Sequence, residues 1–337
     1  MTLASGEAAA RRRGPQSRLA RICVVVRKKK TVAFLIPTLV MLATFSYFPF
    51  FSALYHAFFR WDAMVQSQFV GLGNFIALFR DGTLAVATKN VSIMLVVQTL
   101  KSMLFPLLVA ELIFALRSSR AGYIYRVLFV LPMIVPGVVI LLIWAAYYNG
   151  EAGLINEVLK SAVMAPIVDA VNHVLDVTVN AAFGWSWAVR PMAWLADKRT
   201  ALGALLFMGF PWVGGINLLI VLAGLMNIPQ SVVDAAAVDG AVGLRRFFMI
   251  DLRLIAGQLK LIMVLTVLGT IQEFQTQMIL TKGGPGIATL TPGLHMYQQA
   301  FQFQKMGYAS AIAVMMFLVM MTLTYVNMKF LKSGVEY

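Results

Sequence analysis

The sequence is poor in charged residues, in cysteine and in histidine. Only 12% of its 337 residues are charged, whereas soluble domains carry about 25%, so the composition argues against a soluble protein. The single cysteine, Cys23, excludes an intrachain disulfide bond and a cysteine-based metal cluster. The three histidines, His56, His173 and His295, are too scattered along the chain to indicate a metal site.

Long apolar runs dominate the chain instead. Hydrophobic residues make up 60% of it, and its mean hydropathy is +0.80. A hydrocarbon core about 30 Å thick needs roughly 20 helical residues, and six segments reach that length. We therefore predict an all-α integral membrane protein, a bundle of six transmembrane helices, in which neighbouring helices compensate for prolines inside the spans. The six predicted spans are Thr31–Tyr55, Val91–Leu116, Ile124–Tyr148, Ala201–Met226, Leu261–Leu280 and Ala309–Met328.

The distribution of lysine and arginine predicts the orientation of the bundle. With the N-terminus inside, the cytoplasmic segments hold 18 of these residues and the external loops hold 9, while Lys101 lies within the second span. Because cytoplasmic loops are enriched in positive charge, both termini are predicted to be cytoplasmic. The chain then divides into a basic cytoplasmic N-terminal segment, residues 1–30, and a six-span transmembrane domain, residues 31–335.

The net charge of +14 also raises the question of nucleic-acid binding. Apolar runs separate the basic clusters, so we assign these charges to membrane topology and to attraction by anionic lipid head groups. No nucleic-acid partner is expected. The apolar stretch after Lys30 is too long for a signal peptide and lacks a small-residue cleavage site, which favours an uncleaved first span.

The loop between the third and fourth predicted spans, residues 150–200, is unusually long. Its middle is fairly apolar, yet it includes Asp169, His173 and Asp176. Charged groups in the centre of a membrane cost roughly 2.5–3.5 kcal/mol each, so a seventh span is not expected. One or two amphipathic helices on the outer face fit the pattern better.

One cytoplasmic loop, residues 228–255, carries the most informative pattern. It reads IPQSVVDAAAVDGAVGLRRFFMIDLRLI. Pro229 suits the first turn of a helix, where its missing N–H would be unsatisfied in any case. Asp239-Gly240 then breaks the helix at a residue that tolerates positive φ, and a second helix restarts near Leu244. The pattern predicts a helix–turn–helix that projects from the membrane, with small alanines on one helix and an aromatic-basic patch on the other.

This loop resembles the EAA loop of ABC importer permeases, whose pattern is roughly E-A-A-x-x-x-G followed by I-x-L-P. Asp234-Ala235-Ala236 stands at the EAA triplet, Gly240 at the glycine, and Ile250-Asp251-Leu252 at I-x-L. Two positions depart from the pattern, because Asp234 is shorter than the usual Glu and Arg253 replaces the Pro. Both departures affect the fine geometry of ATPase docking. The resemblance implies an ATPase-coupling site formed by Asp234, Ala235, Ala236, Asp239, Gly240, Arg245, Arg246 and Phe247.

Two further stretches are similar to the carbohydrate-uptake branch of this family. Residues 280–319 contain T-x-G-G-P-x-x-x-T, Y-x-x-A-F and G-Y-A-S-A. Residues 69–81, FVGLGNFIALFRD, resemble the F-V-G-L-x-N-Y that follows the first span of these permeases. The resemblance extends over about residues 34–330 and weakens over 160–190. The chain is similar to the membrane subunits of maltose and glycerol-phosphate transporters.

The resemblance implies a transmembrane permease subunit of an importer that translocates a sugar, an oligosaccharide or a related polyol. The implied partners are a second homologous permease, two ATP-binding subunits that hold ATP and Mg²⁺, and an extracytoplasmic solute-binding protein. The implied location is the bacterial cytoplasmic (inner) membrane, with membrane lipid around the chain. No cofactor or metal is expected in this chain. It lacks the phosphate-binding pattern G-x-x-x-x-G-K-[ST], so it is not expected to be an enzyme that hydrolyses ATP.

Two other function classes compete with this interpretation. A membrane-embedded enzyme needs a catalytic constellation near one membrane face, and Glu111 and Glu273 are the only acids inside the predicted spans. An ion-coupled secondary transporter is the stronger alternative, because it would use a buried acid such as Glu273. A secondary transporter would work as the chain alone, whereas an ABC permease would be inert without its ATPase.

The predicted substrate site combines two spans. In the fifth span, polar residues recur at intervals of 4, 3 and 4, which places them in one stripe on a helix. In the fourth span, a methionine, a glycine and a tryptophan are predicted to share a face. A sugar suits this mixture, because an aromatic ring stacks on its C–H face while hydroxyl and amide groups bind its OH groups. The predicted substrate-binding residues are Met208, Gly209, Trp212, Thr266, Thr270, Glu273 and Gln277.

The resemblance supports part of this set, since positions 208, 209, 212, 266 and 270 coincide with sugar-contact positions of the similar maltose-transporter subunit. Two alternatives stay open. The threonines can bond back to their own helix while Trp212 packs between spans. Glu273 can pair with Lys101 as a structural ion pair.

Overall fold

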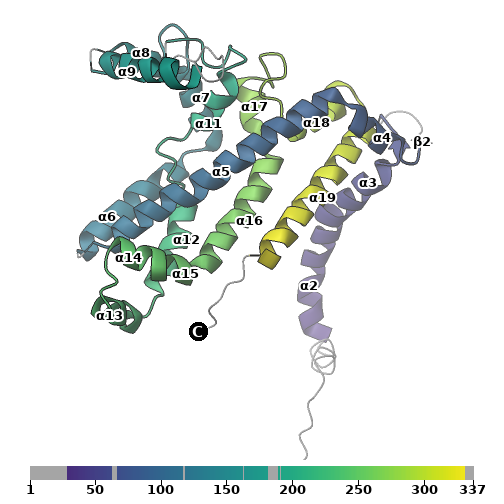
Figure 1. The fold of residues 1–337 in the computed structure, drawn as a ribbon. Coiled ribbons are helices and arrows are strands. Elements are labelled where there is room, and N and C mark those ends of the chain that lie inside the picture. Colours follow the sequence, from purple (N-terminus) through teal and green to yellow (C-terminus); the bar gives the residue numbers. More distant parts are fainter. Residues whose placement is uncertain are drawn as a thin grey trace, which may run out of the picture. The chain divides into compact units, whose positions relative to one another are not determined.

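The computed structural model describes residues 29–330, except 63–66, 117, 162, 181–188 and 190. The predicted basic segment, residues 1–30, therefore lies outside the described residues apart from its last two positions. The chain separates into two compact units, Met1–His56 and Ala57–Tyr337, and each unit is described by itself. Helices make up nearly all of the described chain (Figure 1).

The described part of the first unit is one apolar helical segment. It comprises α2 (Lys29–Leu42), the π-helical turn η1 (Ala43–Tyr47) and α3 (Phe48–His56). The stretch Phe34–His56 covers 23 residues and is long and apolar enough to cross a membrane, as predicted for the first span. Most of its side chains are exposed, Phe34 over 85% of its surface. Exposed apolar surface of this extent indicates contact with lipid or with other proteins.

The second unit begins with a two-stranded antiparallel ribbon and continues as helices. Strand β1 (Phe59–Arg60) pairs with β2 (Gln68–Phe69). The helices are α4 (Gly73–Arg80), α5 (Gly82–Phe114), α6 (Ser119–Val130), α7 (Gly137–Tyr147), α8 (Leu154–Lys160), α9 (Ala165–Leu175), α11 (Ala201–Phe207), α12 (Gly215–Met226), α13 (Gln230–Val238), α14 (Leu244–Arg246), α15 (Leu252–Leu254), α16 (Ala256–Gln272), α17 (Gln275–Leu280), α18 (Pro292–Tyr297) and α19 (Met306–Phe330). Short turns of other helix types are η2 (Leu131–Ile134), η3 (Asp176–Asn180), η4 (Phe247–Asp251) and η5 (Gln298–Gln302).

Long helices and bent helix pairs together account for up to six spans. In the second unit, Gly82–Phe114 with 33 residues and Met306–Lys329 with 24 residues are each long and apolar enough to cross a membrane. Three further helix pairs reach this length only together. They are Ser119–Ile134 with Gly137–Tyr147, Gly215–Met226 with Gln230–Val238, and Leu244–Leu254 with Ala256–Leu280, bent by 90°, 72° and 68°. With the segment of the first unit, the described chain reaches six spans if each bent pair is one span.

Three of the predicted spans are wrong as continuous helices. The third bends by 90° between η2 and α7, where Pro132 and Pro136 interrupt the backbone hydrogen bonds. The fourth is divided into α11 and α12 by residues 208–214, which include Gly209 and Pro211. The fifth is divided into α16 and α17. Hydropathy reports how many consecutive residues are apolar and not whether their helix is interrupted, so it does not predict these breaks.

The core of the second unit lies where α5, α12 and α16 meet. Leu218, Val221 and Leu225 of α12 are fully buried among apolar side chains of α5 and α16. Gly224 permits the close approach, because a Cβ at this position would lie 2.8 Å from the side chain of Gln258 on α16. Figure 1 shows α5 crossing the unit, from α4 and α18 at one end to α6 and α14 at the other. Both ends of the unit are therefore connected by one helix.

Threonine hydroxyls hold the connection between α17 and α18 in shape. The hydroxyls of Thr281 and Thr289 lie 2.7 Å apart, and Thr289 donates to the carbonyl oxygen of Gly284 at 2.9 Å. Asn90 of α5 donates to the carbonyl oxygen of Leu290 at 2.9 Å. The T-x-G-G-P-x-x-x-T pattern therefore encodes a folded connection that is attached to α5.

Two helices, α8 and α9, form within the predicted loop of residues 150–200. Asn156 of α8 is fully buried, donates to the carbonyl oxygen of Met192 at 3.0 Å and accepts the indole N–H of Trp194 at 2.7 Å. These hydrogen bonds of the Asn156 amide connect α8 to residues near the other end of the loop. Figure 1 places α8 and α9 at the end of the unit opposite α13.

Candidate functional site

The predicted helix–turn–helix is present in residues 228–255, termed the coupling loop below. Helix α13 is followed by Asp239, after which Gly240 adopts a φ of +70°. The Gly240 N–H bonds back to α13, and the Ala241 N–H donates to the carbonyl oxygen of Ala236 at 2.8 Å. This is the Schellman arrangement of a helix end. A Cβ on Gly240 would meet no atom within 4 Å, so the backbone conformation alone favours glycine here.

Two of the predicted coupling residues face the core of the chain itself. Ala236 and Phe247 are exposed over only 5% and 8% of their surface. Asp234, Ala235 and Ala237 are exposed on other sides of α13. Ala235, Ala236 and Ala237 therefore do not form one outward surface, because successive helical residues point about 100° apart.

Arg246 connects the coupling loop to α5. Its Nε donates to Asp251 Oδ2 at 2.8 Å, and its Nη2 donates to Glu111 Oε1 at 3.1 Å. Its guanidinium carbon lies 5.4 Å from the centroid of the Phe114 ring. Arg246 is thus bound within the chain, whereas its neighbour Arg245 is exposed and accessible to a partner.

The two acids of this network are sheltered from water. Asp251 is fully buried, and the Glu111 side chain is exposed over 19% of its surface. One oxygen of each carboxylate, Glu111 Oε2 and Asp251 Oδ1, has no hydrogen-bond partner among the described residues. Removing one partner of a buried ion pair is strongly destabilising, so Arg246 holds the coupling loop firmly to the end of α5.

The predicted residues of the fourth span lie just beyond α11, outside regular helix. Met208 follows the last helical residue, and Gly209 and Trp212 adopt φ of +79° and +60°. The prediction that they share a helix face is wrong, because residues 208–214 are not helical. The Trp212 indole N–H donates to the carbonyl oxygens of Phe207 at 2.9 Å and Met208 at 3.1 Å. Trp212 therefore satisfies carbonyl groups that the end of α11 leaves unpaired.

Lys101 of α5 joins this site, although its sequence position did not predict that role. It is exposed over 9% of its surface, and its Nζ donates to the carbonyl oxygens of Leu206 at 2.5 Å and Met208 at 3.4 Å. The same nitrogen lies 5.2 Å from the centroid of the Trp212 ring, a cation–π contact. Carbonyl groups at a helix C-terminus attract cations. Lys101 therefore binds α11, and the described residues contain no ion pair between it and Glu273.

Ser102, the next residue of α5, brings the two predicted groups together. Thr266 of α16 donates its hydroxyl to Ser102 Oγ at 2.8 Å, so this threonine does not bond back to its own helix. Thr270 lies one turn further along α16 and is exposed over 7% of its surface. Trp212 and Thr266 thus contact neighbouring residues of α5, Lys101 and Ser102.

Glu273 and Gln277 do not continue the stripe that Thr266 begins. Glu273 adopts an extended backbone after α16, and its Oε1 accepts a backbone N–H at the start of α17, from Thr276, at 2.8 Å. Gln277 of α17 is fully buried and donates to the sulfur of Met94 at 3.6 Å. Met94 lies about 12 Å along α5 from the contact of Thr266. The prediction of a single stripe is therefore wrong, because the helix ends before Glu273.

The groups around Lys101 and Ser102 are suited to recognition by hydrogen bonds, aromatic contact and positive charge. Within the described ranges, no group of three or more His, Cys, Asp or Glu side chains is placed to hold a metal ion. The most distinctive charged group of the site is the buried ammonium of Lys101.

The chain is similar in sequence to one protein family and to individual transport proteins. The profile of the family described as "Binding-protein-dependent transport system inner membrane component" matches residues 102–337. The probable ABC transporter permease protein YurN of Bacillus subtilis is 30% identical over 306 residues, which cover 90% of this chain and 96% of that protein. The diacetylchitobiose uptake system permease protein NgcF of Streptomyces coelicolor is 28% identical over 346 residues, covering 98% of this chain and 90% of that protein.

A solved structure is similar in fold. It is the crystal structure of a bacterial ABC transporter involved in the import of the acidic polysaccharide alginate. One of its chains matches with a TM-score of 0.74 at 16% sequence identity, covering 94% of this chain and 99% of that one. Together with the family match, this likeness confirms the predicted fold class, an all-α permease bundle.

Proposed function

Because the chain belongs to the family of binding-protein-dependent transport system inner membrane components, it is a permease subunit of an ABC importer, and we propose that its cargo is a sugar, an oligosaccharide or a related polyol. The chain is a transport component, and ATP hydrolysis in this family belongs to a separate subunit. The saccharide cargoes named for NgcF and for the alginate transporter support this proposal. The alternative of an ion-coupled transporter loses its main support, because the carboxylate of Glu273 is used to begin α17.

The proposed importer contains this chain, a second homologous permease, two ATP-binding subunits that hold ATP and Mg²⁺, and an extracytoplasmic solute-binding protein. The family description, which names binding-protein-dependent transport, supports the solute-binding protein in this composition. Both termini lie in the cytoplasm, with residues 1–30 as a basic cytoplasmic segment and 31–335 as the membrane domain. The excess of Lys and Arg on that side supports this orientation. The coupling loop then faces the cytoplasm and residues 150–200 lie outside.

One observation carries the proposal: α5 contacts both candidate sites. At its end, Glu111 binds Arg246 of the coupling loop. About 14 Å away along the same helix, Lys101 and Ser102 contact the residues proposed to bind cargo. Rigid secondary-structure elements carry energetic coupling between distant sites. A displacement of the coupling loop is thus transmitted to the cargo site through one helix.

The mechanism that follows is alternating access driven by the partner subunits. Asp234, Ala235, Asp239, Gly240 and Arg245 form the exposed face that seats in the ATP-binding subunit. ATP draws the two ATP-binding subunits together, the coupling loops follow, and α5 moves with Arg246 so that the cargo site opens outward. Hydrolysis and product release return the bundle to its inward-open state. The cargo contacts residues beside both α11 and α16. A change in the distance between these two helices therefore opens the cargo site to one side of the membrane or to the other.

Substitutions at the cargo site test this proposal. In the complete importer, Trp212→Ala and Thr270→Val should each reduce ATP-dependent uptake by about tenfold, equivalent to ~1.4 kcal/mol of lost binding. Co-purification of the ATP-binding subunits and basal ATP hydrolysis should stay within about twofold. Thr322→Val is the matched control, because the hydroxyl of Thr322 bonds back to its own helix at Leu318. Parental uptake rates in both cargo-site variants would place the binding site elsewhere.

A further inference from the structure

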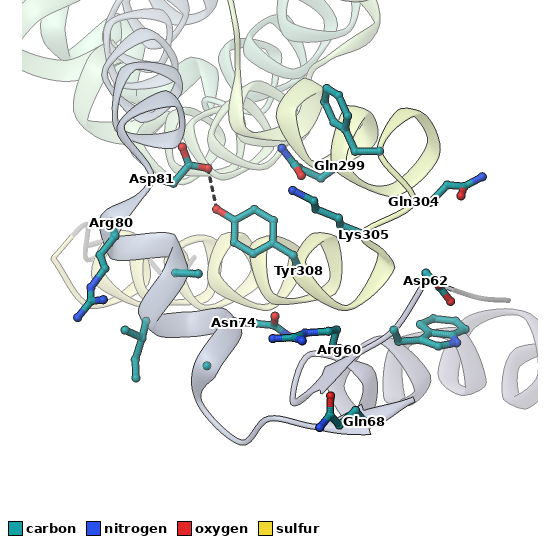
Figure 2. A pocket seen from close by; sticks show the side chains of 15 residues that line it. Arg60, Asp62, Gln68, Asn74, Arg80, Asp81, Gln299, Gln304, Lys305 and Tyr308 are labelled. Carbon is teal, nitrogen blue, oxygen red and sulfur yellow. Dashed lines mark hydrogen bonds between the residues drawn. The ribbon is translucent and has the colours of Figure 1, made fainter. Parts of the chain in front are cut away.

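A hollow lies at the end of the unit opposite the coupling loop. It encloses about 1010 Å³ and is lined by the β1–β2 ribbon, α4, η5 and the start of α19. Figure 2 shows Arg60, Asn74, Lys305 and Tyr308 facing this hollow from four different segments. Cavities that bind small ligands typically measure about 300–1,000 Å³. The hollow is therefore large enough for an oligosaccharide-sized ligand.

Positive charge predominates in the lining. Three cationic side chains, Arg60, Arg80 and Lys305, line the hollow, together with two acids, Asp62 and Asp81. All three cationic residues are exposed. The lining therefore has a net positive charge, which favours an anionic ligand.

Asp81 is an anionic member of the lining, but groups of the chain itself bind its oxygens. Its Oδ2 accepts the hydroxyl of Tyr308 at 2.7 Å and lies 2.9 Å from His295 Nε2. Its Oδ1 accepts the backbone N–H groups of Thr83 and Leu84 at the start of α5. Both oxygens are thus used within the chain, and they fix Tyr308 as a rigid wall of the hollow (Figure 2).

The neutral part of the lining has the chemistry that binds sugar hydroxyls. Trp61 and Phe303 supply aromatic rings, and Gln68, Gln299 and Gln304 supply amides. Among the described residues, the buried Oε1 of Gln299 has no hydrogen-bond partner. This atom has almost no accessible surface, so the amides that a ligand in the hollow reaches are the exposed ones of Gln68 and Gln304.

We propose that this hollow is an outer subsite that binds the acidic group of an anionic saccharide before translocation. The inference rests on the proposed function, which makes this end of the unit the outer one. The guanidinium of Arg60 binds a carboxylate through two parallel hydrogen bonds, and Lys305 adds a second positive charge. Lys101 places a further cation at the cargo site, so an acidic saccharide meets positive charge at both positions. The phosphate of a lipid head group has the same charge, so the test separates the two sources.

Binding to the complete permease–ATPase complex tests the subsite. The complex, purified without its binding protein in phosphatidylcholine nanodiscs, is titrated with trigalacturonate as the acidic probe and maltotriose as the neutral probe. The double variant Arg60→Gln/Lys305→Gln should weaken trigalacturonate binding by about tenfold at low salt and leave maltotriose binding unchanged. Lys89→Gln is the matched control, because Lys89 is an exposed cation of α5 outside the hollow. It should change neither affinity.

Two outcomes would overturn the subsite. One is equal trigalacturonate binding by the parental complex and the double variant. The other is a lipid effect: if phosphatidylglycerol in the nanodisc abolishes trigalacturonate binding through Arg60 and Lys305, the hollow binds lipid head groups. Failure of the proposed function is distinguishable, because the parental importer would then show no ATP-dependent uptake of any saccharide. Failure of the subsite alone leaves that uptake intact.

Discussion

Asp81 joins three helices through one carboxylate. It caps α5, accepts the hydroxyl of Tyr308 on α19 and contacts His295 on α18. Burial by itself raises the pKa of Asp81, but the hydrogen bonds with Tyr308 and His295 outweigh it and lower the pKa to about 2. The ionised carboxylate is therefore the form that the fold stabilises.

This lowered pKa predicts an acid-sensitive contribution to stability. Since the folded-state pKa lies below the ordinary value of 3.8, the contribution is complete above about pH 4 and is lost as the pH falls toward 2. Asp81→Asn keeps the helix cap, because Asn caps as well as Asp, and should lower the Tm by about 3–6 °C at pH 7. Thermal unfolding of the detergent-solubilised chain at pH 7 and pH 2.5 measures the difference, which should shrink at the lower pH. Asp169→Asn is the control, and an undiminished difference at pH 2.5 would contradict the prediction.

At the residue scale, the structure brings two of the proposed cargo residues to one helix, in a geometry that the sequence did not predict. Trp212 and Thr266 contact two neighbouring residues of α5, Lys101 and Ser102. Lys101 carried a usable signal, since an ionisable residue within a span indicates a functional or structural partner. Its partners, however, are backbone carbonyl groups of α11. Every residue has such a carbonyl group, so the sequence does not identify this pairing. For that reason the alternative pairing with Glu273 was wrong.

Among the helices, span number was predictable and span shape was not. Six apolar segments of about 20 residues follow from the thickness of the bilayer. The break in the fourth span is held by a tertiary contact, since Lys101 of α5 binds a carbonyl group at the end of α11, and by a local bond from Trp212. The helix–turn–helix of the coupling loop was predictable because Gly240 is a local signal, which positive φ at a helix end requires.

The turn at Gly240 predicts a sharp difference between two substitutions. Gly240→Trp should uncouple the importer, because a non-glycine side chain strains a φ of +70° and a bulky one prevents close docking. Gly240→Asn should retain most of the coupling, because Asn tolerates this conformation. Co-purification of the ATP-binding subunits and substrate-stimulated ATP hydrolysis are the measurements. Expected losses are about tenfold or more for Trp and less than about threefold for Asn. Normal co-purification and stimulation in Gly240→Trp would remove the docking hypothesis.

At the scale of the whole molecule, α5 gives one continuous path from the hollow beside Asp81 to the coupling loop. Asp81 precedes its first residue, Lys101 and Ser102 contact the residues proposed to bind cargo, and Glu111 binds Arg246 near its other end. Its partners come from residues more than 100 positions away along the chain. Such distant pairings explain why periodicity alone could assign the loop and the spans but not their connection.

The dependence of this path on partner subunits predicts the behaviour of the isolated chain. Reconstituted alone into proteoliposomes, it should show no saccharide uptake under a proton or sodium gradient, because no described acid of the bundle is placed at the cargo site and Glu273 begins α17. The complete importer is then supplied with ATP and Mg²⁺ on the side of the ATP-binding subunits and with loaded binding protein on the other side. It should accumulate at least about tenfold more saccharide than the same vesicles with ADP. Gradient-driven uptake by the chain alone would instead establish an ion-coupled transporter. Loss of ATP-driven uptake when only the ATP-binding subunits are omitted, with the chain inserted in equal amount, would show that these subunits supply the energy.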